Sequence, residues 1–296
     1  MEKPAILHML TPARNMSPFD VNMAIDAGFQ HAQAYAGVTL AEVAGLTQDA
    51  IFSRGPKGVR RTGIFIGGRE IDLAAEMLRA AQAALTPPFV VSLFCDPSGG
   101  FTTAAAAVAA LERALAGENG LADKRLLILG AGPVGAAAAV LAAGCGARVQ
   151  LASHSALERA RGLTDMIATK FGAAVEPVHS GDAHRRNLLA AADLLLGAAK
   201  AGVQVVSRDE LGAAGRLLAA ADLNAVPPDG IEGLGVLDDR KPLAAASGRA
   251  VGIGALAVGQ IKYQTQRRLF EKMLAGEPVV LGLTECFEMA RAVCRE

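Results

Sequence analysis

The sequence predicts an α/β protein made of two α/β domains with a cleft between them, and three observations support this prediction. Short apolar runs alternate with longer helical segments up to about residue 120, and the same alternation then returns. Such alternation is typical of parallel sheets covered by helices. The length of 296 residues suits two domains of roughly 150 residues each. A glycine-rich turn between two apolar runs indicates that the second domain is a doubly wound parallel sheet.

The first half of the chain predicts three strand–helix units. Ser17 is a candidate N-cap, with Pro18 at the first helical position and Asp20 at the third, so a helix begins there. Strands are expected at 5–10, 63–68 and 87–96, and helices from residue 18, at 72–85 and at 102–117, where Gly117 is a stop signal.

The second half repeats this pattern. Strands are expected at 125–130, 148–153, 173–178, 192–199, 216–225 and 250–256, and helices at 134–143, 155–172 and 259–274. One domain boundary falls inside the helix at 102–117 or in the GENGLADK segment that follows, and the other lies near residue 250. We expect the C-terminal helix to return to the first domain.

The composition excludes several classes of function. The chain has 29 Lys and Arg and 29 Asp and Glu, and this zero net charge argues against a nucleic-acid or membrane-surface binder. Aromatic residues are only 4% with no Trp, which argues against a base-stacking surface. The N-terminus has no signal-peptide pattern and the four Cys form no C-x-x-C pair, so we expect free thiols in a reducing cytoplasm. No metal-ligand spacing is present, and we assign no metal.

The segment LLILGAGPVG contains a G-x-G-x-x-G motif in the setting that binds dinucleotides. A strand precedes it, a helix begins within it, and a second strand follows at the spacing of a βαβ unit. Gly130 permits the tight turn, Gly132 leaves room for a pyrophosphate, and Gly135 lets the helix pack closely. Pro133 and Val134 begin the helix whose N-terminus would face the phosphates. The motif predicts a Rossmann-type dinucleotide site, the alternative being a plain glycine turn.

The end of the second strand, Ser153-His154-Ser155, indicates which dinucleotide fits. NAD-specific folds commonly place Asp or Glu there, and that acid would repel the 2′-phosphate of NADP. Here the acid is absent, so NADP is permitted, while no basic residue in the turn demands it. Arg159 and Arg161 follow on the next helix. The sequence therefore predicts use of both NAD and NADP, although His154 could also be a plain exposed loop residue.

Four further polar or glycine-rich stretches stand out, and three of them follow or lie at predicted strand ends, where open α/β sheets bind ligands. They include MSPFD, FSRGPKGVRRTG, CDPSGGFTT and DLNAVPPDG. Asp96, Ser98, Thr102 and Thr103 could form a hydrogen-bonding rim, or serve only as turns and caps. Lys262, judged from its helix alone, is a solvated surface residue. The residues by themselves indicate an NAD(P)-dependent oxidoreductase that acts on a small substrate.

Blocks outside the glycine motif carry a more specific signal. HMLTP, MSPFDVNMAIDAGF, LTQDAIFSR, RTGIFIGG, DPSGGFTTAAAAV, DLNAVPPDGIEGL and GIGALAVGQIKYQTQRRLF together resemble the bacterial methylene-tetrahydromethanopterin dehydrogenases over nearly the whole chain. The chain is most similar to the branch that uses NAD or NADP. The strictly NADP-dependent branch carries an Arg close to the position of His154.

The resemblance implies a fold, a reaction and site residues. It implies a pterin-side domain of residues 1–110 plus 256–296 and an NAD(P)-binding domain of residues 111–255. The reaction is oxidation of N5,N10-methylene-tetrahydromethanopterin to the methenyl cation in the formaldehyde oxidation of methylotrophs, by a cytoplasmic homo-oligomer that could be a trimer. Lys262 becomes the catalytic candidate, orienting the pterin. The pterin pocket would involve Asp20, Asp96, Ser98, Thr102 and Thr103, and Ala198, Ala199 and Asn224 would border the nicotinamide.

Other functions remain open on the sequence. The same chemistry on methylene-tetrahydrofolate is the first alternative, because the pterin heads are similar. The phosphate-bearing tail of tetrahydromethanopterin favours a basic entrance, and Arg54, Lys57, Arg60 and Arg61 could form one or be a solvated loop. A non-catalytic NAD(P)-binding sensor is the second alternative. A shikimate-type or alcohol dehydrogenase would need a Lys–Asp or Tyr–Lys proton relay, which is not evident in the chain.

Overall fold

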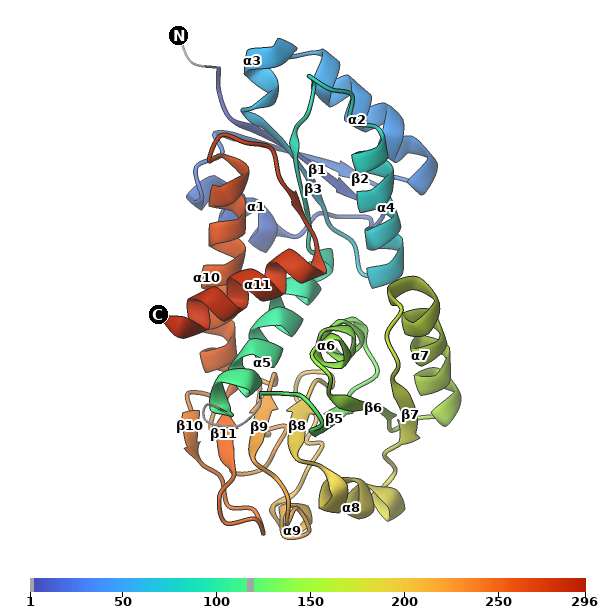
Figure 1. Ribbon diagram of the computed structural model, residues 1–296, viewed down its shortest axis with the longest axis vertical. Helices are drawn as coiled ribbons and strands as arrows, with labels where there is room; N and C mark the ends of the chain where they lie inside the picture. Colours follow the sequence, from blue (N-terminus) through green and yellow to red (C-terminus); the bar gives the residue numbers. More distant parts are fainter. Residues whose placement is uncertain (1–2, 116–119) are drawn as a thin grey trace. The chain divides into compact units, whose positions relative to one another are not determined.

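The computed structural model describes residues 3–115 and 120–296, so the predicted stop at Gly117 lies outside the described residues (Figure 1). The chain divides into two compact units. The first contains residues 1–102 and 263–289, and the second contains residues 103–262 and 290–296. The two units are described separately below.

The first unit is built on a parallel sheet of five strands in the order β12-β4-β3-β1-β2. Its strands are β1 (Ile6–Thr11), β2 (His31–Ala36), β3 (Thr62–Ile66), β4 (Ser92–Cys95) and β12 (Val280–Leu281). Its helices are α1 (Pro18–Asp26), the short 3-10 turns Leu40–Glu42 and Pro97–Gly99, α2 (Val43–Phe52), α3 (Gly55–Val59) and α4 (Ile71–Ala83), with the later part of α10 (Ala255–Met273) and the first part of α11 (Leu283–Arg295).

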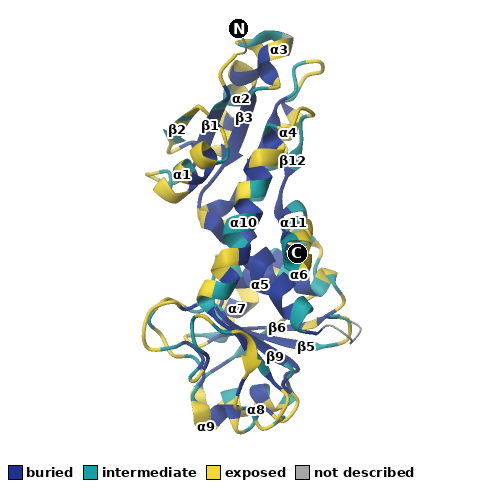
Figure 2. Ribbon diagram, turned by 90° about the vertical axis from the view of Figure 1, so that its left-hand side faces the viewer, coloured by how far each residue is buried: buried dark blue, intermediate teal, exposed yellow. Residues whose placement is uncertain are grey.

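Both faces of this sheet are covered, which explains why β3 and β4 are buried along their whole length (Figure 2). Helices α2 and α4 lie on one face and α1 and α10 on the other (Figure 1). On the α10 face, Phe270 packs against Phe65 of β3 in a tilted arrangement and edge-to-face against Phe94 of β4, with ring centroids 5.5 and 5.0 Å apart. Strand β2 is an edge strand, and its residues are mostly exposed.

The second unit is built on a sheet of seven strands in the order β10-β11-β9-β8-β5-β6-β7, parallel except for β10. Its strands are β5 (Arg125–Leu129), β6 (Arg148–Ser153), β7 (Glu176–His179), β8 (Leu194–Gly197), β9 (Ala219–Asp222), β10 (Asp239–Pro242) and β11 (Val251–Ile253). Its helices are α5 (Gly100–Ala114), α6 (Pro133–Gly144), α7 (Leu157–Phe171), α8 (Asp182–Ala191) and α9 (Arg208–Leu211).

Strand β5 shows how the core of the second unit is divided between two faces. Leu127 and Leu129 join a buried cluster with Leu189 of α8 and Leu211 of α9. Ile128 points to the other face, toward α6, where α5 and α7 also lie (Figure 1). The strand order reverses direction between β5 and β8, and open α/β sheets bind ligands at such a point.

The predicted fold class is confirmed, with two parallel α/β sheets and a doubly wound second sheet. The prediction missed the strands β2, β10 and β12 and the helices α2, α3, α8, α9 and α11. The strand predicted at 87–96 is only Ser92–Cys95, because its first residues form a Pro-Pro turn closed between Thr86 and Phe89. Helix α10 begins at Ala255, directly after β11, and not near residue 259. Ser17 does stand at the N-cap of α1, although its side chain makes no capping hydrogen bond.

Candidate functional site

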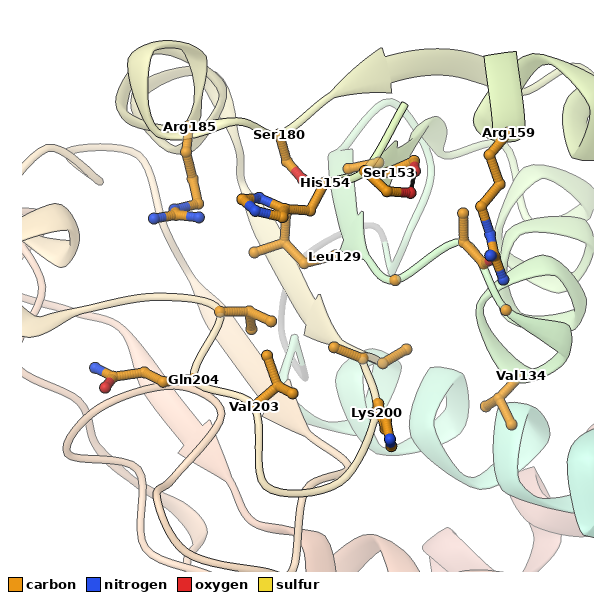
Figure 3. A pocket seen from close by; sticks show the side chains of 18 of the residues that line it. Leu129, Val134, Ser153, His154, Arg159, Ser180, Arg185, Lys200, Val203 and Gln204 are labelled. Carbon is orange, nitrogen blue, oxygen red and sulfur yellow. Dashed lines mark hydrogen bonds between the residues drawn. The ribbon is translucent and has the colours of Figure 1, made fainter. Parts of the chain in front are cut away.

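A cavity of about 750 Å³ lies in the second unit at the carboxyl ends of β5, β6 and β8 (Figure 3). This volume is in the range of small-molecule and cofactor sites. The cavity holds most of the cofactor-binding residues predicted from the sequence, which are Gly130, Gly132, Pro133, Val134, Ser153, His154, Ser155, Ala198 and Ala199. It is also lined by residues that the sequence reasoning did not assign, which include Arg159, Ser180, Asp182, Arg185, Lys200, Val203 and Gln204.

The three motif glycines have three different physical roles. Gly130 has φ +140°, and a Cβ there would lie 2.3 Å from the carbonyl oxygen of Ala198. A Cβ on Gly135 would lie 2.1 Å from the carbonyl oxygen of Gly130, so Gly135 packs the helix on the turn and does not itself line the cavity. A Cβ on Gly132 would meet nothing within 4 Å. Gly130 and Gly135 are therefore required by packing, while Gly132 keeps open the space in front of α6.

The end of β6 forms one wall of the cavity without supplying a negative charge. Ser153 is buried, and its hydroxyl lies 3.3 Å from that of Ser155 and accepts the N–H of Ala156 at 3.4 Å. His154 is exposed, and its carbonyl oxygen lies 3.0 Å from Nε2 of His179. At the end of β6 the cavity wall therefore contains Ser153, His154 and Ser155 and no carboxylate from this segment.

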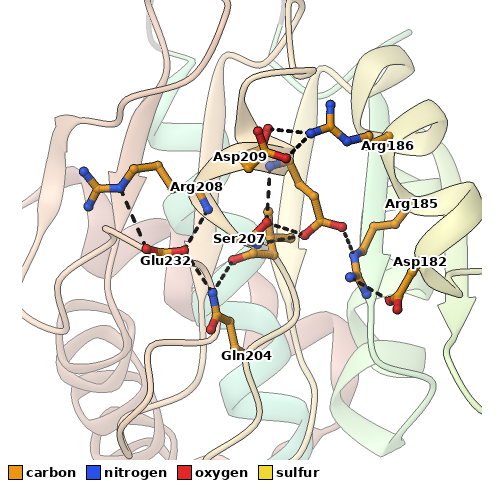
Figure 4. A network of polar contacts seen from close by, with 10 residues as sticks. Asp182, Arg185, Arg186, Gln204, Ser207, Arg208, Asp209 and Glu232 are labelled. Atoms are coloured by element: carbon orange, nitrogen blue, oxygen red, sulfur yellow. Dashed lines mark hydrogen bonds and ion pairs between the residues drawn. The ribbon is translucent and has the colours of Figure 1, made fainter.

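An acid does reach the cavity from the next turn, between β7 and α8. Asp182 lines the wall, and its carboxylate accepts a hydrogen bond from Arg185 at 3.0 Å. Arg185 also donates to Glu210 of α9 at 2.6 Å, so it faces two carboxylates (Figure 4). Burial alone would raise the pKa of Glu210, but hydrogen bonds from Ser207 and Arg185 hold it below its ordinary value. Arg185 is therefore already neutralised by the protein.

The loop after β8 forms the opposite wall, and Asn224 holds it in place. Lys200 opens a turn closed by the hydrogen bond from Val203 N–H to Lys200 C=O, at 3.2 Å. The side-chain oxygen of Asn224 accepts the N–H of Gly202 within this turn at 2.9 Å. Asn224 itself is buried and lies outside the cavity lining. Its contacts show that it positions this loop, while its predicted contact with the cofactor stays a prediction.

In the first unit, the predicted rim residues are engaged in holding the start of α5. Oδ1 of Asp96 accepts the N–H groups of Phe101 and Thr102, and Oδ2 accepts the Thr102 hydroxyl at 2.6 Å. Ser98 has φ 51° and donates to Gly68 C=O at 2.6 Å. Asp96 and Thr102 are buried, whereas the neighbouring Thr103 is half-buried. This arrangement is a helix cap made by a carboxylate.

Asp20 is bonded to helix α10, the helix that carries Lys262. Asp20, buried in α1, accepts a hydrogen bond from the side chain of Gln266 at 2.7 Å. Gln266 is also buried and follows Lys262 by four residues, so the two share one face of the helix. Sequence reasoning missed Gln266, although the i,i+4 spacing from Lys262 could have pointed to it.

Other features bear on chemistry and location. No group of three or more His, Cys, Asp or Glu residues in the described ranges could hold a metal ion. Within the same ranges, no helix is long and apolar enough to cross a membrane. The four cysteines are free, and burial raises the pKa of Cys95 and Cys286 well above the ordinary value, with the charge of Asp96 adding to it.

Comparison with known proteins identifies the family. Residues 18–98 match the model of the methylene-tetrahydromethanopterin dehydrogenase N-terminal domain, and residues 100–206 match the alanine dehydrogenase/PNT C-terminal domain. The NAD(P)-dependent methylenetetrahydromethanopterin dehydrogenase of Methylorubrum extorquens is 48% identical over 97% of both chains. The chain belongs to the methylene-tetrahydromethanopterin dehydrogenase family. A more distant relative is the bifunctional protein MdtA of the same organism, which is 30% identical over 93% of this chain and 94% of its own.

Solved structures show the same fold at low sequence identity. Quinate dehydrogenase from Corynebacterium glutamicum, in complex with NAD, aligns with a TM-score of 0.53 at 15% identity, covering 97% of this chain and 98% of that chain. A shikimate 5-dehydrogenase from Mycobacterium fortuitum aligns with a TM-score of 0.50 at 18% identity, covering 99% and 98% of the two chains. These matches show that this chain shares its α/β fold with the two dehydrogenases.

Proposed function

We propose that this family member transfers hydride from N5,N10-methylene-tetrahydromethanopterin to NAD or NADP, giving the methenyl cation. The single observation that carries the proposal is the 48% identity, over 97% of both chains, to an NAD(P)-dependent methylenetetrahydromethanopterin dehydrogenase. The glycine turn and its cavity supply the physical counterpart of that similarity.

The residues around the cavity fit an NAD(P) molecule. The space in front of Gly132 is open, and Pro133 begins a helix whose first N–H groups have no acceptor within the helix. Ser153-His154-Ser155 presents no carboxylate against a 2′-phosphate, so both nucleotides are accommodated. NAD(P), when bound there, supplies the hydride acceptor.

The chemistry of the substrate requires few catalytic groups from the protein. The C–H bond of the methylene carbon breaks with both electrons leaving as hydride, and the lone pairs of the two flanking nitrogens stabilise the amidinium cation left behind. No proton leaves the carbon, so no general base is needed. The contribution of the chain is to hold the two reactants in line, and positioning is a large catalytic term.

The residues proposed for the pterin side divide by their contacts. Lys262 is proposed to orient the pterin by hydrogen bonding, with Gln266 one turn further along α10 and Asp20 of α1 accepting the hydrogen bond of Gln266. Asp96, Ser98 and Thr102 make the bonds that fix the start of α5, which supports an indirect role for them. The division of labour between a pterin-side domain (1–110 with 256–296) and an NAD(P)-binding domain (111–255) is part of the same proposal.

The test is formation of NAD(P)H, followed by absorbance, with methylene-tetrahydromethanopterin and methylene-tetrahydrofolate each combined with NAD and NADP. Turnover of the methanopterin substrate with both nucleotides is expected. Turnover of the folate substrate alone would move the protein to the folate reaction. Cofactor binding with no turnover of either pterin would make the protein a sensor.

We further propose that the protein works in the cytoplasm as a homo-oligomer. A cytoplasmic location would suit the four free cysteines and an NAD(P)-linked reaction. The oligomeric state is measured by light scattering during gel filtration, where a mass near that of one chain, 30.3 kDa, would contradict a homo-oligomer.

A further inference from the structure

The cavity of the second unit contains four charged side chains, and they are not equivalent. Arg159, Arg185 and Lys200 are cationic and Asp182 is anionic. Arg185 is held by Asp182 and Glu210 at 3.0 and 2.6 Å. No ion pair joins Arg159 or Lys200 to a carboxylate in the part of the chain that the structure describes. Two positive charges in the cavity wall are therefore left uncompensated.

Arg159 is hydrogen-bonded to the glycine turn, and the backbone next to Lys200 packs against it. The Arg159 Nε donates to Ala131 C=O, inside the G-x-G sequence, at 3.2 Å. A Cβ on Gly130 would lie only 2.8 Å from the backbone nitrogen of Ala199, the residue before Lys200. Figure 3 shows the two side chains in the cavity wall, Arg159 from α7 and Lys200 from the loop after β8.

We propose that Arg159 and Lys200 form a two-cation clamp for the diphosphate of the cofactor. A dinucleotide diphosphate carries about two negative charges, which matches the two uncompensated cations, and charge-assisted hydrogen bonds to phosphate are among the stronger polar contacts. The clamp takes one cation from helix α7 and the other from the loop after β8. Asn224, through Gly202, fixes the loop that carries Lys200. This inference rests on the proposed function, since it concerns the same cavity.

The test measures binding and does not depend on pterin turnover. NADH and NADPH are each titrated by their fluorescence into the wild type, Lys200→Ala and Arg159→Ala, and ADP and adenosine are used as competitors. Each variant is expected to weaken NADH and ADP binding about tenfold, the usual effect of losing a bond between charged groups, while adenosine, which has no phosphate, keeps its affinity. Lys200→Arg is expected to restore most of the loss.

Arg161→Ala is the matched control, because Arg161 is exposed on the same helix and does not line the cavity. Equal losses of ADP and adenosine affinity in folded variants, or unchanged ADP affinity, would overturn the clamp. A loss confined to NADPH would also overturn it, by assigning the cations to the 2′-phosphate. A wild type that binds NADH but oxidises neither pterin would defeat the proposed function alone, and one that binds neither NADH nor ADP would defeat both.

Discussion

The N-termini of helices α5 and α6 differ in how their first N–H groups are capped. Helix α5, whose first three residues belong to the first unit, begins against the carboxylate of Asp96, which accepts the N–H groups of Phe101 and Thr102. Helix α6 of the second unit begins at Pro133, and its N-cap residue Gly132 has no side chain to accept the first N–H groups of the helix. The first N-terminus is occupied by the protein itself, whereas the second is left for a ligand anion. Polar residues at a strand end therefore indicate a helix cap as readily as a ligand-binding site. The glycine at the N-cap of α6 is the more informative signal of a ligand-binding site.

The strongest way to break the comparison is to fill the turn before α6. Gly130→Ala would place a Cβ 2.3 Å from Ala198 C=O at φ +140°. Backbone strain of this kind costs about 1–3 kcal/mol, and the contact with the Ala198 backbone adds to it. We expect a lower free energy of unfolding, measured by urea denaturation, and NADH affinity lost by more than an order of magnitude.

Gly132→Ala provides the contrast. Its Cβ would meet nothing within 4 Å, and its φ of −119° suits any residue, so unfolding should be nearly unchanged. Cofactor affinity should still fall, because the methyl group enters the space kept open for the phosphates. A variant that binds NADH as tightly as the wild type would show that this space is not the phosphate site.

Lys262→Ala tests the pterin side of the comparison. If Lys262 orients the substrate, turnover should fall about 100-fold, the scale of a misaligned reactant, while NADH affinity stays close to that of the wild type. Steady-state kinetics and NADH titration separate the two effects. Lys272→Ala, on the exposed last turn of the same helix, is the control. Equal losses in turnover and NADH affinity would contradict a pterin-side role.

Substitution of Asp96 distinguishes a cap from a substrate ligand. Asp96→Ala removes the acceptor for two N–H groups and one hydroxyl, which should lower the free energy of unfolding by about 1–2 kcal/mol. Asp96→Asn keeps a good capping oxygen and should lose little stability or activity. If Asp96→Asn folds normally but loses turnover, the carboxylate acts on the substrate and the two N-termini are more alike than their hydrogen bonds indicate.

The local features of the second unit were predictable from the sequence, and the contacts between distant residues were not. Gly130 and Gly135 are required by backbone packing within one βαβ turn, and that turn has a sequence signature. Asp182 reaches the cavity from a different turn, after β7, and the pattern at residues 153–155 contains nothing that announces it. Gln266 and Asp20 are 246 positions apart, so their hydrogen bond follows only from the return of α10 to the first unit.

His8, like Asp20 and Asp96, is a polar residue of the first unit whose side chain contacts another side chain of the protein. Nδ1 of His8 lies 3.1 Å from the Tyr35 hydroxyl, beside a cavity of about 260 Å³ that is also lined by Asp49 and Ser53 of the α2 segment. Burial, and then the positive charge of Arg54, lower the pKa of His8. Its protonation is therefore less favourable in the folded than in the unfolded chain, so the unfolded chain binds more protons on acidification.

The lowered pKa of His8 predicts a pH dependence of stability, which is the smallest of the expected effects. The contribution of His8 to stability should be complete above its ordinary pKa of about 6.5 and should be lost as the pH falls through the lower folded-state value. Urea denaturation from about pH 8 to about pH 5 should show the wild type losing more stability than His8→Gln, whose amide does not titrate in this range. Tyr35→Phe, which retains the histidine, should keep the wild-type slope. If the free energy of unfolding of the wild type and of His8→Gln falls equally with pH, other groups cause the acid sensitivity. In that case His8, unlike Asp96, contributes little to the stability of the first unit.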